Sequence, residues 1–210
     1  MKSYIDEYAI KSGAYLTIAT VGNPKFAGGP RFNAFITSFS DNMTSNWNEE
    51  QVYGRQDPIG TFQGTTRKIS LGFDVPAATI EEAKKNLASI NQVKQFMYPA
   101  YSSNVKNNTT TNALSLAKSP LFRLKFANLI QNGSGDGLLG WIGSFSATPV
   151  IDMGMFNEQV AGQLAGNFFP KVYNVSLDFT PQHEYDLGWE KDGDPIDPKF
   201  RTKFPYDGGS

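Results

Sequence analysis

The stretch TTRKISLGFDV, residues Thr65–Val75, decides the fold because its side chains alternate between two kinds. Every second residue in its latter part is apolar, the set being Ile69, Leu71, Phe73 and Val75. Polar or small residues stand between them, namely Lys68, Ser70, Gly72 and Asp74. Successive side chains of a strand point to opposite faces, so the stretch predicts a half-buried strand of about 11 residues, roughly 36 Å long.

The segments before this strand are less regular. Residues 41–58, DNMTSNWNEEQVYGRQDP, show little periodicity and predict a long connection. A connection of that length usually has a role of its own or folds against a partner. Earlier in the chain, RFNAFITSFS (31–40) has apolar residues on both faces and YLTIATV (15–21) is short and apolar, so both predict strands.

A helix follows the central strand. Pro76 ends the strand, and Thr79 with Glu82 three residues later forms the pattern of a capping box. Apolar residues then recur at spacings of three and four, namely Ile80, Ala83, Leu87, Ile90, Val93 and Met97. This spacing predicts one long amphipathic helix over about residues 79–98, which Pro99 ends.

The second half of the chain returns to strand patterns. Residues 100–120 form a polar bridge, in which NNTTTN (107–112) predicts an exposed loop. LFRLKFANLI (121–130) and LLGWIGSFS (138–146) flank the turn-forming QNGSGDG and predict a β-hairpin. KVYNVSLDFTP (171–181) predicts a further strand, whereas residues 154–170 give no clear pattern.

These elements predict an α+β fold, a mostly antiparallel β-barrel or sandwich with one long helix and long loops. The 210 residues suffice for one domain with a proper core. We expect that domain to occupy residues 1–181. From Gln182 onward the chain is rich in Gly, Pro and Asp and predicts an extended polar tail over 182–210.

The bulk composition excludes several classes of function. A net charge of −1 provides no overall field to attract nucleic acid. The chain has no cysteine, which excludes disulfides, a thiolate nucleophile and cysteine-ligated metals. Asp6 and Glu7 interrupt the N-terminal residues, so we expect neither a signal peptide nor a membrane span.

The sequence offers no persuasive catalytic or ligand-binding motif. The one histidine, His183, lies in HEYDL, which lacks the HExxH spacing of zinc proteases. GSGDGLLG (133–140) leads into a strand and lacks the Gly-Lys-Ser/Thr of a phosphate loop. The aspartates of KDGDPIDP (191–198) lack the remaining positions of a calcium loop.

Basic residues on the predicted strands do not point to a nucleic-acid groove either. They alternate with core residues, as solvated or partner-facing charges do, and they are Arg55, Arg67, Lys68, Arg123 and Lys125. We therefore expect no catalytic, cofactor-binding or metal-binding residue, and no enzymatic activity.

WNEEQVYGRQDPI (47–59) and TTRKISLGFDVPA (65–77) carry a resemblance to a known group of proteins. Together with SPLFRLKFANLI and FPKVYNVSLDFTPQHE they resemble structural proteins of tailed-bacteriophage virions, in particular tail or baseplate components with the tail-tube fold. The resemblance extends over roughly residues 36–184. It implies copies joined edge to edge, so that their sheets form a continuous homo-oligomeric ring around a lumen through which DNA can pass.

The resemblance also implies where the chain would work. Its extra loop and its tail favour a tube initiator or a hub-adjacent baseplate component, with the main tube subunit or a baseplate wedge protein as alternatives. Such a protein is made in the host cytoplasm, resides in the virion, contacts tube, hub, wedge or sheath neighbours, and has no cofactor.

The residues expected at the interface between subunits are concentrated before the central strand. Trp47 and Tyr53 would be anchors and Arg55 a polar lock on an inter-subunit arm, residue types that interfaces favour. Asp57 and Arg67 complete the predicted interface set. Local packing within the domain is the competing interpretation for Trp47 and Tyr53.

Two functions from other classes remain open. One is a glycan-binding or cell-wall-lytic tail module, which would need a groove with exposed aromatic residues and a pair of carboxylates. The other is an assembly chaperone that is absent from the finished particle.

Overall fold

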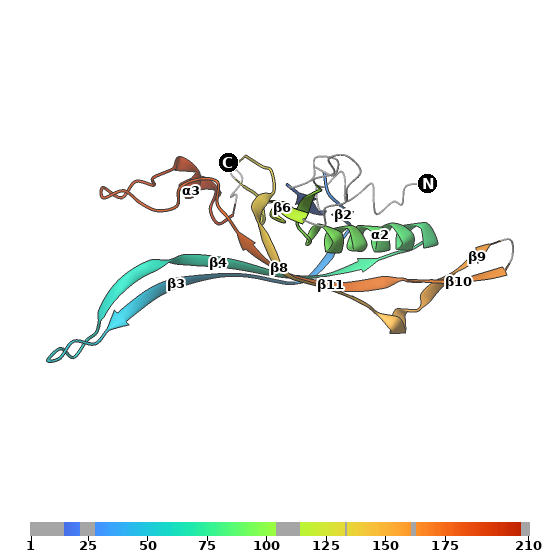
Figure 1. Cartoon of the computed structure of the whole chain (residues 1–210), viewed down its shortest axis with the longest axis horizontal. Coiled ribbons are helices and arrows are strands. Elements are labelled where there is room, and N and C mark those ends of the chain that lie inside the picture. The colour runs from blue at the N-terminus through green and yellow to red at the C-terminus, as the bar shows by residue number, and fades with distance from the viewer. Residues whose placement is uncertain (1–14, 22–27, 104–113, 133, 161–162, 207–210) are drawn as a thin grey trace.

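The computed structural model describes residues 15–21, 28–103, 114–132, 134–160 and 163–206. Its main feature is a seven-stranded antiparallel sheet in the order β2-β1-β7-β8-β11-β4-β3. The strands of this sheet are β1 (Leu16–Thr20), β2 (Arg31–Phe32), β3 (Phe35–Glu50), β4 (Ile59–Pro76), β7 (Phe122–Phe126), β8 (Leu138–Pro149) and β11 (Val172–Pro181). Figure 1 shows helix α2 (Ile80–Phe96) on one side of the sheet. The expected β-rich, antiparallel architecture is therefore confirmed.

The inner part of β4 forms the centre of the core, as its alternation predicts. Its four apolar side chains are between 0% and 1% exposed, and they are Ile69, Leu71, Phe73 and Val75. β11 runs beside it with Leu71 opposite Leu177 and Phe73 opposite Val175, and both partners are buried too. Burial of a side chain of this size contributes about 1.5–3 kcal/mol, so this pair of strands supplies much of the stability of the domain.

The sheet curls around its core. Seven strands laid flat would span roughly 29 Å at about 4.8 Å between neighbours. Only Asn33 and Ala34 join the two outermost strands, β2 and β3, and they bridge about 10 Å at full extension. Phe32 on β2 accordingly contacts Phe73 on β4, with 5.9 Å between ring centroids. The structure thus has one curled sheet where a barrel or sandwich was expected, and the described residues show no β2–β3 ladder.

Helix α2 begins where the capping box predicts. The Thr79 hydroxyl accepts a hydrogen bond from the Glu82 backbone N–H at 3.2 Å, and the Glu82 carboxylate accepts one from the Ala78 N–H at 2.8 Å. Ala83, Ile90 and Val93 are the helix residues that are fully buried. The rest of the predicted apolar set is half-buried, so the helix lies on the core without being enclosed by it.

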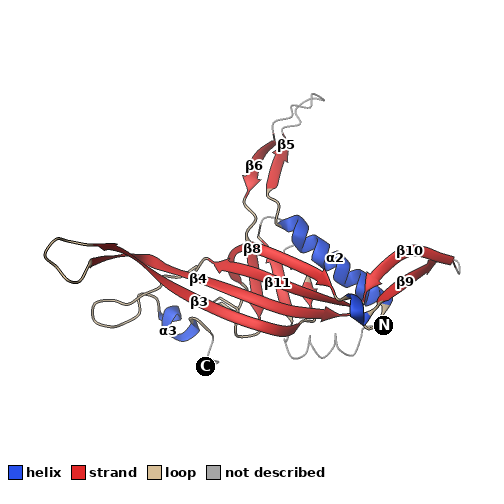
Figure 2. Ribbon diagram, turned by 90° about the horizontal axis from the view of Figure 1, so that it is seen from below, coloured by secondary structure: helices blue, strands red, loops and turns tan. Residues whose placement is uncertain are grey.

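The irregular connection that the sequence predicts over residues 41–58 is shorter in the structure, where only residues 51–58 are irregular. β3 continues through Glu50, and β4 begins at Ile59, with paired residues from Phe35 opposite Asp74 to Glu50 opposite Ile59. Together they form a long ribbon that projects from the sheet (Figures 1 and 2). Neither face of its outer part, beyond Asp41 and Arg67, is buried, so no apolar periodicity marks that part in the sequence. We call residues 45–65 the arm.

The segment after β11 is not an extended tail. Residues 182–206 fold back beside β3 and β4, where α3 (Pro198–Lys203) forms with Asp197 as its N-cap (Figure 2). Aromatic contacts hold the segment together, with Trp189 against Phe200 at 5.2 Å and Phe200 against Phe204 at 5.1 Å between ring centroids. We call residues 182–206 the C-terminal segment.

Three further hairpins complete the fold. β7 and β8 pair as predicted, but residues 127–137 separate them, a longer connection than the expected turn. Residues 154–170, for which the sequence gave no clear prediction, contain a hairpin of β9 (Met155–Val160) and β10 (Gln163–Pro170). This hairpin follows a 3-10 turn, η2 (Ile151–Met153). β5 (Ala100–Ser103) pairs with β6 (Leu114–Lys118), and the predicted NNTTTN loop lies outside the described residues.

Candidate assembly surfaces

The arm exposes large apolar side chains on both of its strands. Trp47 on β3 lies opposite Phe62 on β4, with 5.2 Å between their ring centroids in an edge-on contact. Trp47 is still 57% exposed and Phe62 is 52% exposed. The Trp47 indole N–H donates a hydrogen bond to the Ser45 hydroxyl at 2.9 Å. Trp47 therefore packs against a residue of its own chain and is still exposed, because Phe62 covers only part of its ring.

The tip of the arm is a short turn. The Arg55 N–H donates to the Val52 carbonyl at 3.1 Å, and Gly54 has a φ of +82°, which favours glycine. Tyr53 has no cover and is fully exposed. Arg55 and Asp57 are exposed as well. Four of the five residues predicted for the interface thus lie on the arm, namely Trp47, Tyr53, Arg55 and Asp57.

A register shift lies along the arm between Asn46 and Trp47. Gly64, opposite Asn46, has a φ of +148°, a conformation that other residues rarely adopt. Because of this shift, Trp47 lies opposite Phe62, although the preceding residue, Asn46, lies opposite Gly64. Phe62, Ile59 and Met43 are exposed apolar residues of the ribbon that the sequence analysis missed, since the region gave no strand pattern.

Arg67, the fifth predicted interface residue, is a buried residue at the root of the arm. It is 6% exposed, and it pairs with the buried Asp41 on the neighbouring strand. The guanidinium donates to this carboxylate through Nη2 at 2.6 Å and through Nε at 2.9 Å. Its side chain is therefore used within the chain, and the prediction that it faces a partner is corrected.

The C-terminal segment covers this ion pair. Arg67 also donates to the Pro205 carbonyl at 3.4 Å, and its guanidinium stacks 5.1 Å from the centre of the Phe204 ring. His183 Nε2 lies 3.4 Å from Arg67 Nη1. Burial, reinforced by the Arg67 charge, lowers the pKa of His183 to about 4. His183 is therefore neutral at pH 7 and helps to pack the segment against the root of the arm.

A second set of polar contacts ties the C-terminal segment to the β7–β8 connection. Arg123 on β7 forms a two-pronged ion pair with Glu184, with Nη1 to Oε2 at 2.7 Å. This pairing raises the pKa of Arg123 and lowers the pKa of Glu184. Asn132 joins the group, since its amide donates to Glu184 at 3.1 Å and its oxygen accepts from the Asp136 N–H at 2.9 Å.

The side of the sheet opposite α2 is bare and polar. Asp178 on β11 accepts hydrogen bonds from Ser144 on β8 and Ser70 on β4, both at 2.7 Å. These bonds lower the pKa of Asp178. Asn174 similarly donates to Asp74 at 2.8 Å. These polar side chains are satisfied by neighbours on the same face, and the exposed Phe35, opposite Asp74, is an apolar exception on it.

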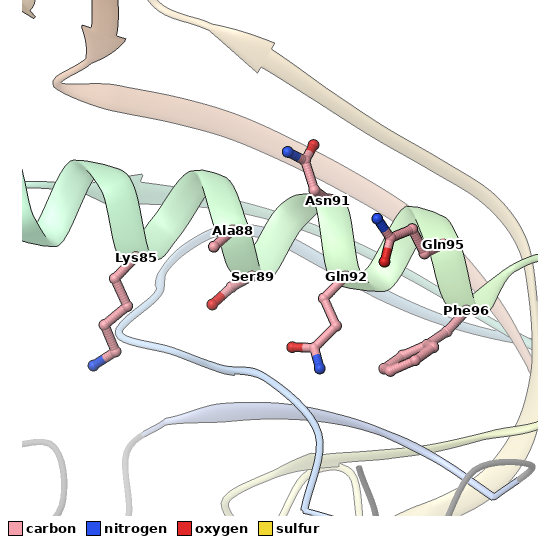
Figure 3. A pocket seen from close by; sticks show the side chains of 7 residues that line it. All are labelled: Lys85, Ala88, Ser89, Asn91, Gln92, Gln95 and Phe96. Atoms are coloured by element: carbon pink, nitrogen blue, oxygen red, sulfur yellow. The ribbon is translucent and has the colours of Figure 1, made fainter. Parts of the chain in front are cut away.

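Residues of the described part of the chain line two hollows near α2. The first, of about 470 Å³, runs along the helix and is lined by Lys85, Ala88, Ser89, Asn91, Gln92, Gln95 and Phe96 (Figure 3). Its polar lining groups are three amides, one hydroxyl and the Lys85 ammonium, and it contains no carboxylate. The second, of about 370 Å³, lies at the C-terminal end of α2 and is mainly apolar. Neither brings together an acid, a base and a nucleophile.

The described residues contain no cluster of three or more metal-ligating side chains. Within the same residues, no helix is both long enough and apolar enough to cross a membrane. Comparison with known proteins gave no match, either to a family model or to a curated protein.

Proposed function

We propose that this chain is a structural subunit of a bacteriophage tail or baseplate, a tube initiator or hub-adjacent component that assembles into a ring. The main tube subunit and a wedge protein are the closest alternatives. The observation that supports the proposal best is the arm. A two-stranded ribbon by itself is marginally stable in water, and this one exposes Trp47 and Phe62 on its two strands and Tyr53 at its tip.

The outer edge of β3 supports the same proposal, because no strand among the described residues pairs with that edge. β3 pairs on one side with β4, and it is the last strand of the seven-stranded sheet. A long edge strand presents unpaired N–H and C=O groups and invites pairing with another chain. In a ring a neighbouring subunit would cover this edge, and the curled sheets would join into one continuous wall around a lumen.

The bare polar side of the sheet supports a wall in preference to a binding module. Its serine, asparagine and aspartate groups bond to one another, as with Ser70, Ser144 and Asp178, which leaves few of them free for a ligand. We propose that this side lines the lumen, where passing DNA would meet no fixed sequence-specific contact. The protein would then reside in the virion.

The test is the assembly state of the purified chain. Light scattering after size exclusion, across a wide concentration range, should show a concentration-dependent oligomer, and electron microscopy of that species should show rings. The double variant Trp47→Ser with Phe62→Ser should remain monomeric and folded, whereas Ser176→Ala on the bare side should assemble normally. A wild-type chain that stays monomeric at every concentration would overturn the proposal.

A further inference from the structure

The apolar hollow at the end of α2 has the form of a socket for one large side chain. Its lining comes from three segments and comprises Met97, Ser119, Pro120, Leu121, Phe122, Trp141 and Ile142. Phe122 and Ile142 are buried, whereas Trp141 is 42% exposed. At about 370 Å³ the hollow is near the lower end of the roughly 300–1,000 Å³ of small-molecule pockets. We call it the socket.

The surroundings of the socket are basic and aromatic. The segments that build it, residues 91–103, 114–122 and 138–149, contain two lysines, Lys94 and Lys118, and no carboxylate. Both lysines are exposed. Tyr98, directly after the socket residue Met97, is 76% exposed. Exposed aromatic side chains around an apolar pocket are typical of a protein–protein contact.

The tip of the arm is the chemical complement of the socket. Between Glu49 and Asp57 it carries three carboxylates, Glu49, Glu50 and Asp57, against the one guanidinium of Arg55, which gives a net charge of −2. Tyr53 stands fully exposed between them. An aromatic anchor with acidic flanks therefore matches an apolar socket with two lysines beside it.

We propose that Tyr53 of one copy enters the socket of the next copy, with the acidic residues of the arm tip facing Lys94 and Lys118. The two surfaces lie apart in one chain, because the arm points away from the region where α2, β6 and β8 meet (Figure 2). The contact must then join two copies through different surfaces. Such contacts propagate into rings or filaments. This inference therefore rests on the proposed function, and it identifies the surface of the neighbouring copy that the arm contacts.

The absence of cysteine from the chain permits a clean cross-linking test. One batch carries Gln56→Cys at the arm tip, which leaves Tyr53 intact, and another carries Ser119→Cys at the socket. Mixed under assembling conditions with a short bismaleimide, they should form a cross-linked dimer that contains one copy of each, identified by mass spectrometry. Ser176→Cys on the bare side of the sheet, paired with Gln56→Cys, should form none.

A second variant tests the anchor itself. Adding Tyr53→Ala to the Gln56→Cys chain should lower the yield of the mixed dimer about tenfold or more, as expected for a buried aromatic anchor, whereas Tyr53→Phe should retain it. Rings that assemble without the Gln56–Ser119 cross-link, or a yield indifferent to Tyr53→Ala, would overturn this inference and leave the proposed function standing. A chain that never oligomerises would overturn both.

Discussion

The inner and outer halves of β4 are one continuous strand in two different environments. Both halves pair with β3, but only the inner half, from Ile69 to Pro76, also pairs with β11 and faces the core. The outer half, from Ile59 to Thr66, pairs with no described strand other than β3 and is almost wholly exposed. Both halves thus have backbone pairing with β3, but the burial of side chains is confined to the inner half. Because an isolated two-stranded ribbon is only marginally stable in water, we expect the inner half to be the more stable one.

The largest expected effect on the free energy of unfolding comes from removing a buried side chain from the inner half of β4. Phe73→Ala should lower the free energy of unfolding by about 3–5 kcal/mol, since it removes a fully buried ring that contacts Phe32. Urea denaturation followed by circular dichroism measures it. Phe62→Ala, the same change on the outer half, is the matched control and should cost less than about 1 kcal/mol. Equal losses would contradict the division between the halves.

The boundary between the halves should be nearly as sensitive. Asp41→Ala leaves the Arg67 guanidinium buried without its carboxylate and should cost about 3 kcal/mol. Exchanging both partners for apolar residues, Asp41→Leu with Arg67→Met, should cost much less, because no unpaired charge remains. Denaturation of the three proteins measures the difference. If the double variant lost as much free energy of unfolding as Asp41→Ala, the cause could not be an unpaired buried charge. The interaction between Arg67 and Asp41 would then itself stabilise the root of the arm.

Acid should loosen the same boundary through His183. Its pKa in the folded protein is about 4, below the ordinary 6.5, so unfolded chains bind a proton first as the pH falls. Stability should therefore be full above about pH 6.5 and should decline between pH 6.5 and 4. Allowing for the exposed part of the ring, we expect a loss of roughly 2 kcal/mol.

The variant His183→Phe should remove that part of the pH dependence. Arg67, which lowers the pKa of His183, and Asp41, which opposes it, are unchanged in this variant. Stability measured by denaturation at pH 7.0 and pH 5.0 should then differ less than in the parent chain. An identical pH profile in both proteins would exclude His183 as its source. The carboxyl groups of Glu184 and Asp178, whose pKa values are lowered, lose their contributions at still lower pH.

The smallest effect on stability is expected at the arm tip. Tyr53→Ser removes a side chain that touches little of its own chain, so the free energy of unfolding should change by no more than about 0.5 kcal/mol. Under the proposed function the same change should weaken assembly, measured by light scattering. A large loss of stability in the monomer would mean that Tyr53 packs within the chain after all.

The sequence predicts well the elements that the core defines. Alternation identified the inner half of β4, β11 and most of the β7–β8 hairpin, and Thr79 with Glu82 located the start of α2. Each of these signals arises because one face of an element is buried. The same reasoning failed for residues 41–50 and 59–64. Both faces of the ribbon are exposed there, so no buried face requires apolar residues at every second position.

The five residues predicted for an interface differ in their exposure. The exposure of Trp47, Tyr53, Arg55 and Asp57 agrees with an interface position, whereas Arg67 has its partners inside the chain. Asp41 is far from Arg67 in sequence and comes beside it only through the β3–β4 register. The socket was beyond prediction for the same reason, because its lining comes from three separate segments.

Because the C-terminal segment folds back onto the root of the arm, that root can be completed only after the strands of the main sheet have been synthesised. A ribosome makes residues 182–206 after every strand of the main sheet, so Arg67 and Asp41 remain uncovered until those last residues have emerged. The arm of a growing chain would then have an unfinished base, and unfinished chains would make poor assembly partners. A chain truncated after Pro181 should accordingly show an arm that proteases cut readily, and an arm as resistant as in the longer chain would refute this timing.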